Sequence, residues 1–196
     1  LRDHPTDLAH FFHLSRVTAA AVDAAVASGV PTVMTPTDFY PICPTSQLRL
    51  PDGSLCSGPS AFAANCVRHL TQTSDAGRLG RRLRVLPDAA VAAGVVVIQN
   101  DLVPERWFSP FVRASAARPE FMRQRLNMVD RILAPTHLME SLLIKNGIHR
   151  SRITHQPYGI DLQHLRRDIR KGTHPALRVG FIGTLFEHKG AHLLIK

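Results

Sequence analysis

Short apolar runs alternate with helix-like segments along most of this 196-residue chain, and that alternation limits its fold more than any other feature. Four runs rich in apolar or β-branched side chains have the length and composition of strands, at residues 7–14, 30–37, 131–136 and 152–159. Helix-like segments stand between them, at residues 16–28, near 60–72, 118–129 and 137–146. Strands separated by helices predict an α/β fold, a Rossmann-like doubly wound parallel sheet with helices on both faces.

Single residues mark several of the expected boundaries. Ser15 stands where the N-cap of the first helix is expected, and Gly29 and Gly147 stand where helices are expected to end. The run at residues 91–100 is apolar but has no clear period, so it is compatible with a strand or with a helix.

The chain is basic, with a net charge of +9 from 24 Lys and Arg against 15 Asp and Glu. Much of this charge lies in arginine clusters at residues 78–84, 113–125 and 164–171. Such a balance favours phosphorylated substrates, anionic membrane surfaces or nucleic acid as partners, although solvated helix faces explain the same clusters without a partner. Nucleic acid is disfavoured because no stacking platform or helix-turn-helix pattern accompanies the arginines.

The hydrophobic pattern bears on localisation. No stretch approaches the roughly 18 consecutive apolar residues that a membrane-spanning helix needs. The first residues, LRDHPTDLAH, lack the order of a secretory signal peptide. These features predict a cytoplasmic protein, and its basic surface suits a peripheral contact with anionic lipid at the inner face of the membrane.

A change of composition divides the chain. Residues 161–176 are polar and charged and contain Gly and Pro, which is typical of a linker. We therefore expect a first domain at residues 1–160, with a Cys-rich loop at 41–69, and the first strand and helix of a second Rossmann-like domain at 177–196. Because the chain does not begin with Met and the second domain only begins, we expect a fragment of a longer polypeptide that is inactive by itself.

The stretch FIGTLFEHKG, residues 181–190, has the features of a phosphate-binding turn. A strand that ends in Gly183 lets a ligand approach the backbone, and a helix after Gly190 directs its N–H groups and positive dipole end at the same place. Lys189 adds a positive charge, so a diphosphate is the expected occupant. A tight turn with a solvated lysine explains the same residues without a ligand.

Two motifs resemble a known family. RILAPTHLMESLLIKNGIHRSRITHQPYGID, residues 131–161, resembles the segment that closes the first domain of GT-B glycosyltransferases of the retaining family four. FIGTLFEHKG is similar to the opening of that family's second domain. The resemblance implies transfer of a sugar, with retention, from a nucleotide-diphosphate sugar to a glycan or lipid-linked acceptor, as in cell-envelope polysaccharide synthesis. It implies no cofactor for catalysis, and the family's Glu-x7-Glu motif is absent from this sequence.

The resemblance also assigns donor-side roles. Lys189 takes the place of a lysine that contacts the donor diphosphate, in a loop bounded by Gly183 and Gly190. Thr184 stands where the family has an arginine, and it donates one hydrogen bond but supplies no charge.

On the acceptor side, VMTPTDFYPICP, residues 33–44, resembles a strand end that faces the family's interdomain cleft. Thr37 takes the place of a histidine near the transferred sugar, and Asp38 is retained. His13 and His10 match a His-rich strand end in relatives, and a neutral side chain at a strand edge is the alternative, above all for His10. The resemblance therefore makes Asp38, Thr37 and His13 the candidate catalytic residues.

Three cysteines and one histidine mark the loop at 41–69. Cys66 and His69 have a C-x2-H spacing that can chelate one ion, and Cys43 and Cys56 can complete a tetrahedral Cys3His zinc site. Similar loops in relatives often carry four cysteines, the last at the place of His69. Free thiols, or one disulfide with an odd thiol, are the alternatives.

Two other functions are compatible with the sequence. A non-catalytic, zinc-stapled module could bind a polyanion through the basic surface, and a GT-B epimerase could rearrange a nucleotide sugar without transfer. Other enzymes are disfavoured, because the chain has no Asp-x-Asp motif, no paired carboxylates arranged for glycoside hydrolysis and no Gly-x-Ser-x-Gly motif.

Overall fold

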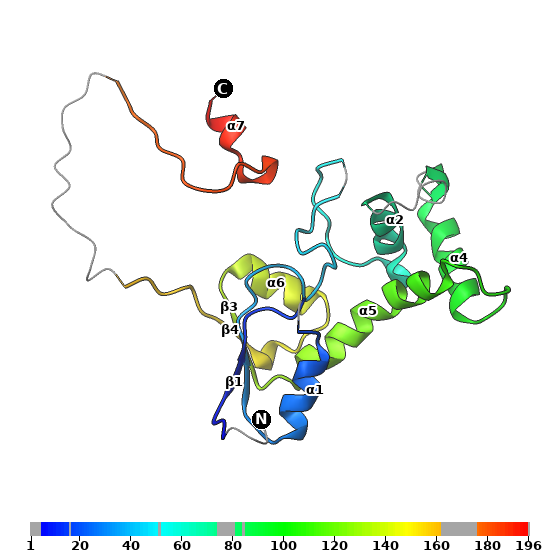
Figure 1. Cartoon of the computed structure of the whole chain (residues 1–196), viewed down its shortest axis with the longest axis horizontal. Helices are drawn as coiled ribbons and strands as arrows, with labels where there is room; N and C mark the ends of the chain where they lie inside the picture. The colour runs from blue at the N-terminus through cyan, green and yellow to red at the C-terminus, as the bar shows by residue number, and fades with distance from the viewer. Residues whose placement is uncertain are drawn as a thin grey trace. The chain divides into compact units, whose positions relative to one another are not determined.

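The structure, a computed structural model, describes residues 5–15, 17–50, 52–73, 81–83, 85–161 and 176–195 (Figure 1). The chain divides into two compact units, Leu1–Tyr158 and Gly159–Lys196. The first unit holds the sheet and its helices.

A parallel sheet forms the centre of the first unit. Its four strands are β1 (Ala9–Phe11), β2 (Thr32–Met34), β3 (Arg131–Ala134) and β4 (Ile153–His155). They pair in the order β1-β2-β3-β4, and every pair is parallel. All four predicted strands are confirmed, with shorter bounds than the apolar runs, and the α/β class is confirmed with them.

Helices connect the strands. The crossover helices are α1 (Ala20–Ala27) between β1 and β2, and α6 (His137–Lys145) between β3 and β4. The longer β2–β3 connection contains η1 (Ala61–Ala63), α2 (Ala64–Thr73), α4 (Asp88–Gln99) and α5 (Ser109–Met128). A short turn, η2 (Arg150–Arg152), precedes β4. Within the described ranges, no helix combines the length and hydrophobicity that crossing a membrane requires.

The ambiguous run at residues 91–100 lies in a helix, α4. Val91 and Val95, four residues apart, are buried, as expected of one helix face. Val95 packs with Val67 of α2 and Val112 of α5 in a small core of its own. The run is apolar because α4 is partly buried between neighbouring helices, and its lack of a clear period had left strand and helix open.

Helices cover one face of the sheet. The strand register places Phe11, Met34, Ile132 and Ile153 side by side on that face. They pack in one core with residues of α1, α5 and α6. Figure 1 shows α1 and α5 on the same side of the strands, and the two helices are in contact.

The opposite face of the sheet is open in the described part of the chain. Leu8, His10 and Phe12 alternate with the covered Phe11 and are exposed. The prediction of helices on both faces is therefore wrong for these residues. The reason is topological: the strand order never reverses, so right-handed crossovers place each connecting helix on the same face.

Local chemistry explains the helix ends. The prediction of Ser15 as an N-cap is wrong, because α1 begins at Ala20, and Thr18 before it takes a positive φ of 69°. Gly29 and Gly147 are confirmed as helix-closing residues, with φ of 69° and 85°. At Gly147 a Cβ would lie 2.7 Å from Cδ of Arg123, so another residue would be strained by the positive φ and would displace the Arg123 side chain.

The second unit contains only short helical turns among its described residues. These are η3 (Glu187–Lys189) and α7 (Ala191–Leu194). The prediction of a strand at 177–183 is wrong here, since the stretch pairs with no other strand and Ile182 is 103% exposed. A strand is stable only when its backbone groups pair with a neighbour. Of the expected linker, residues 162–175 lie outside the described residues.

Candidate functional site at the carboxyl edge of the sheet

The polar residues that follow β1 and β2 meet at one edge of the sheet. His13 comes two residues after β1 ends, and Thr37 and Asp38 come shortly after β2. The backbone N–H of Thr35 donates to the carbonyl of Phe11 at 2.8 Å, which continues the strand pairing up to this edge. Because parallel strands end at a common edge, the three predicted catalytic residues lie near one another.

His13 and Asp38 form a direct hydrogen bond. Nε2 of His13 lies 2.5 Å from Oδ2 of Asp38. The other ring nitrogen, Nδ1, accepts from the backbone N–H of Ser15 at 3.1 Å and lies 2.8 Å from the Ser15 hydroxyl. An acceptor nitrogen carries no proton, so the neutral ring has its proton on Nε2 and donates it to the carboxylate.

This pair is accessible as well as ordered. The side chains of His13 and Asp38 are 37% and 30% exposed. Oδ1 of Asp38 accepts from the backbone N–H of Tyr40 at 2.8 Å, which fixes the carboxylate in an Asx turn. A ligand could therefore reach a histidine whose tautomer and orientation are already set.

An aromatic ring and an arginine extend the site. The ring of Tyr40 stacks on His13 with centroids 5.7 Å apart. The guanidinium carbon of Arg118 lies 4.7 Å from the centroid of Tyr40, and Nη2 of Arg118 donates to the Tyr40 carbonyl at 2.5 Å. Sequence reasoning missed the roles of Ser15 and Arg118: the first looked like a helix cap and the second like one of many arginines.

Thr37 and His10 have different surroundings. The hydroxyl of Thr37 donates to the carbonyl of Phe12 at 3.3 Å, so it joins the ends of β1 and β2. His10 lies on the open face of the sheet, where Nε2 is 2.9 Å from Oγ1 of Thr35 and the ring packs on Phe12. The structure brings His13 and Asp38 together, with Thr37 beside them, whereas strand alternation places His10 away from the pair.

The ends of β3 and β4 add a second cluster that sequence reasoning did not single out. The rings of His137 and His155 stack with centroids 3.7 Å apart. Nδ1 of His137 lies 3.2 Å from Oε2 of the mostly buried Glu140, which Arg150 also contacts. His137 and Glu140 lie one turn apart on α6, whereas Arg150 and His155 come from the segment that follows, and no local pattern links the two pairs.

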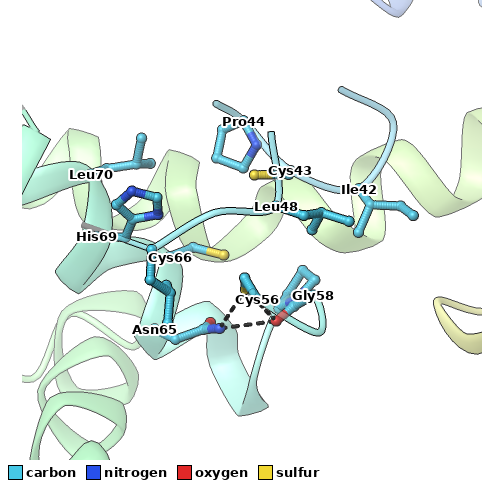
Figure 2. Close-up of a pocket in the computed structure, with 12 residues that line it drawn as sticks. Ile42, Cys43, Pro44, Leu48, Cys56, Gly58, Asn65, Cys66, His69 and Leu70 are labelled. Atoms are coloured by element: carbon cyan, nitrogen blue, oxygen red, sulfur yellow. Dashed lines mark hydrogen bonds between the residues drawn. The ribbon is translucent and has the colours of Figure 1, made fainter. Parts of the chain in front are cut away.

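The predicted zinc ligands line a single pocket. Cys43 is buried, Cys56 and Cys66 are partly buried, and none of the three forms a disulfide. These cysteines and His69 line a cavity with a volume of about 10 Å³. Figure 2 shows the four side chains in this pocket. Within the described ranges, no three or more His, Cys, Asp or Glu side chains form a group that could hold a metal ion as they stand.

Burial controls the ionisation of two of these residues. It raises the pKa of the Cys66 thiol to about 11, an effect that the thiols of Cys56 and Cys43 increase and that Arg118 opposes. Burial also lowers the pKa of His69. At neutral pH the Cys66 thiol therefore keeps its proton in this arrangement, and His69 favours the neutral imidazole.

The arginines of residues 113–125 bind to groups of the protein itself. Arg125 pairs with Asp23 at 2.9 Å, and Arg123 pairs with Glu120 at 2.6 Å. Arg113 contacts Asp101. This cluster is thus explained by internal pairing, and the cluster at 164–171 lies outside the described residues.

The predicted diphosphate residues lie in the second unit. Lys189 ends the turn η3, and Gly190 follows it with a positive φ of 75°. Gly183 and Thr184 lie in the unpaired stretch before that turn. Because no strand leads into these residues in the described part of the chain, the strand-turn-helix geometry expected of a phosphate site is not formed there.

The fold and the site together define an α/β protein with a parallel sheet and an accessible Asp–His pair at the carboxyl edge of its strands. Comparisons with protein-family models, with curated proteins and with solved structures found no match for this chain.

Proposed function

We propose that this chain is part of a retaining GT-B glycosyltransferase and that the unit up to Tyr158 is its acceptor-side domain. The observation that carries the proposal is the contact between His13 and Asp38 at the carboxyl edge of a parallel sheet. In open α/β sheets this edge is where ligands bind. The resemblance of residues 131–161 and 181–190 to the paired family motifs supports the same function.

In the proposed reaction the His13–Asp38 pair handles the acceptor hydroxyl. The hydroxyl oxygen forms a bond to the anomeric carbon, and the bond from that carbon to the diphosphate breaks, with its electron pair passing to the phosphate oxygen. For this step the acceptor hydroxyl replaces Ser15 at Nδ1 of His13, and the lone pair of that nitrogen then receives the hydroxyl proton. The carboxylate of Asp38 then stabilises the imidazolium through its bond to Nε2.

The donor side of the proposal rests on the second unit. Lys189 is proposed to neutralise charge on the departing diphosphate, with Gly183, Thr184 and Gly190 allowing the backbone to approach it. Thr184 supplies a hydroxyl where the family has a cation, so donor binding in this protein depends more on Lys189. The proposed acceptor is a glycan or a lipid-linked sugar in cell-envelope polysaccharide synthesis, and no metal is required for the chemistry.

The test uses the full-length protein that contains this chain, with a panel of nucleotide sugars and glycan or lipid-linked acceptors. Nuclear magnetic resonance of the product is expected to show a new glycosidic bond with retained anomeric configuration. His13→Gln should abolish most of the transfer, whereas His149→Gln should not, because His149 is exposed and its hydrogen bonds to Asn127 and Arg152 come from its backbone.

Other products would contradict the proposal. Conversion of the nucleotide sugar to its epimer, with no transfer, would support an epimerase. Salt-sensitive binding of polyanions with no turnover of any donor would support a non-catalytic binding module.

A further inference from the structure

The proposed catalytic role leaves the Cys-rich loop at residues 41–69 unexplained. Cys43, Cys56, Cys66 and His69 come from positions up to 26 residues apart, yet all four line one cavity. The cavity volume is about 10 Å³, roughly the room of a single water molecule or ion. Its other neighbours are mainly apolar, including Ile42, Leu48 and Leu70.

Polar groups contact two of the sulfur atoms, and the Cys56 thiol, while it keeps its proton, donates to the carbonyl of Gly58 at 3.5 Å. Oγ1 of Thr45 lies 3.1 Å from Sγ of Cys43. Nδ2 of Asn65 donates to Sγ of Cys56 at 3.7 Å and to the carbonyl of Gly58 at 2.9 Å (Figure 2). Donors of this kind orient metal ligands and stabilise their negative charge.

We propose that Cys43, Cys56, Cys66 and His69 bind one Zn²⁺ ion in a closed, tetrahedral structural site. Binding releases the three thiol protons to solvent, and the neutral imidazole of His69 supplies the fourth ligand. The side chains line the cavity without yet forming a ligating group, so entry of the ion draws them inward.

The ligand set and the size of the cavity both favour zinc. Three thiolates and one imidazole suit Zn²⁺, which prefers four sulfur and nitrogen ligands in a tetrahedron. A cavity of about 10 Å³ has room for one ion and not for an iron–sulfur cluster. Three thiolates around a divalent ion leave one net negative charge. The positive charge of Arg118 opposes the rise in the pKa of Cys66 that burial causes, and so favours its thiolate form.

The ion would hold the segment that carries the Asp–His site. The backbone N–H of Cys43 donates to the carbonyl of Phe39 at 2.7 Å, and the N–H of Phe39 donates to the carbonyl of Ser46 at 3.2 Å. The first ligand is therefore tied directly to the residue that follows Asp38. This inference does not depend on the proposed glycosyl transfer, because its test measures metal binding alone.

The experiment starts from the 196-residue chain, purified without chelator. Elemental analysis is expected to find one zinc ion per chain, and thiol titration is expected to find three reactive thiols only after a chelator and denaturant are added. Replacement by Co²⁺ should give sulfur-to-cobalt charge-transfer absorption and the visible bands of a tetrahedral site.

Variants identify the ligands. Cys66→Ser and Cys43→Ser should lose the bound zinc and the charge-transfer absorption, whereas His69→Cys should keep both, because a fourth thiolate replaces the imidazole. His149→Ala is the control and should bind one zinc ion like the unaltered chain. If the serine variants do not fold, the His69→Cys variant and the unaltered chain still decide the matter.

Two results would overturn the inference. One is a chain with less than a tenth of an equivalent of zinc, no cobalt charge-transfer absorption and three freely reactive thiols without chelator. The other is full zinc binding by Cys43→Ser, which would exclude the proposed set of four ligands.

Discussion

Two aspartates at opposite edges of the same sheet perform different tasks. Asp130 precedes β3 at the amino edge, and its Oδ2 accepts from both the backbone N–H and the hydroxyl of Thr32, each at 2.9 Å. Asp38 follows β2 at the carboxyl edge, and its Oδ2 bonds to the ring of His13 instead. The first carboxylate joins two strands, and the second holds a titratable side chain.

The partners of each carboxylate explain the difference. Thr32 is fully buried, and its hydroxyl also accepts from the backbone N–H of Asp130 at 3.0 Å. The two residues thus donate hydrogen bonds to each other, which joins the start of β2 to the start of β3. The partner of Asp38 remains partly exposed and has a lone pair on its other nitrogen. The close hydrogen bonds of Asp130 come from backbone and hydroxyl groups, beside a longer contact with Arg152 at 4.0 Å, and they stabilise the fold. A carboxylate that polarises an accessible imidazole, as Asp38 does, can take part in chemistry.

Asp38→Asn is expected to cause the largest effect. The neutral amide cannot stabilise an imidazolium, so kcat for sugar transfer by the full-length protein should fall by about 10²- to 10⁴-fold. The free energy of unfolding should change by less than about 1 kcal/mol, because the amide oxygen can still accept from the N–H of Tyr40. Steady-state kinetics and denaturant unfolding measure the two quantities.

Asp130→Asn is the matched control for that variant, with the same chemical change at the other edge of the sheet. Its turnover should stay within about twofold of the unaltered protein. Equal losses of turnover in the two variants would show that the two edges do not differ in function, and the assignment of Asp38 would then fail.

Asp130→Ala is expected to have the next largest effect, on stability. It leaves the N–H and hydroxyl of the buried Thr32 without their shared acceptor, which costs about 1–3 kcal/mol. Urea unfolding of the 196-residue chain should show a lower midpoint with an unchanged slope. A variant as stable as the unaltered chain would mean that water replaces the carboxylate at no cost.

The sheet and most helices were predictable from the sequence, because burial on one face imposes an apolar pattern that a reader can see. The four strands follow the apolar runs, and Gly29 and Gly147 close helices as expected. The coverage of only one face was not predictable, because it depends on strand order, which an apolar run does not reveal. The strand expected at 177–183 was not predictable for a similar reason, because an apolar run does not reveal whether a neighbouring strand is present to pair with it.

The site was predictable in part. Asp38 and His13 were identified through a family resemblance, and the structure brings them within hydrogen-bond distance. Ser15 was assigned to a helix cap, because capping and ring-bonding serines look alike in a sequence. The partnership of Arg118 with Tyr40 joins residues 78 positions apart, and no local pattern carries that information.

Ser15→Ala is expected to reduce turnover modestly. It removes the hydroxyl that bonds to Nδ1 of His13 and leaves the backbone N–H bond, so the ring keeps its tautomer but is held less firmly. A net loss of about 0.5–1.5 kcal/mol corresponds to a fall in kcat of roughly 2- to 12-fold. If the Ser15 hydroxyl acts through its contact with Nδ1 of His13, the pH at which kcat is half-maximal should also shift. Ser15→Thr, which keeps a hydroxyl, should restore the original pH profile. An unchanged pH profile would contradict this role.

The smallest expected effect is the pH dependence that Asp130 gives to stability. Hydrogen bonds from the backbone N–H and the hydroxyl of Thr32 lower the pKa of this carboxyl, although its side chain is 64% exposed. In the unfolded chain an aspartate titrates near pH 4, roughly its ordinary value. The unfolded state therefore binds the proton first as the pH falls, so the stabilising contribution is complete above about pH 4 and is lost as the pH falls through the lower, folded value.

The unaltered chain should accordingly lose more stability between about pH 5 and pH 3 than Asp130→Asn loses. Subtracting the two unfolding curves isolates this residue from other carboxyls whose pKa values are lowered by local hydrogen bonds, such as Asp52 and Glu120. Identical pH profiles would mean that the hydrogen bonds from Thr32 stabilise the fold equally well whether or not residue 130 carries a charge.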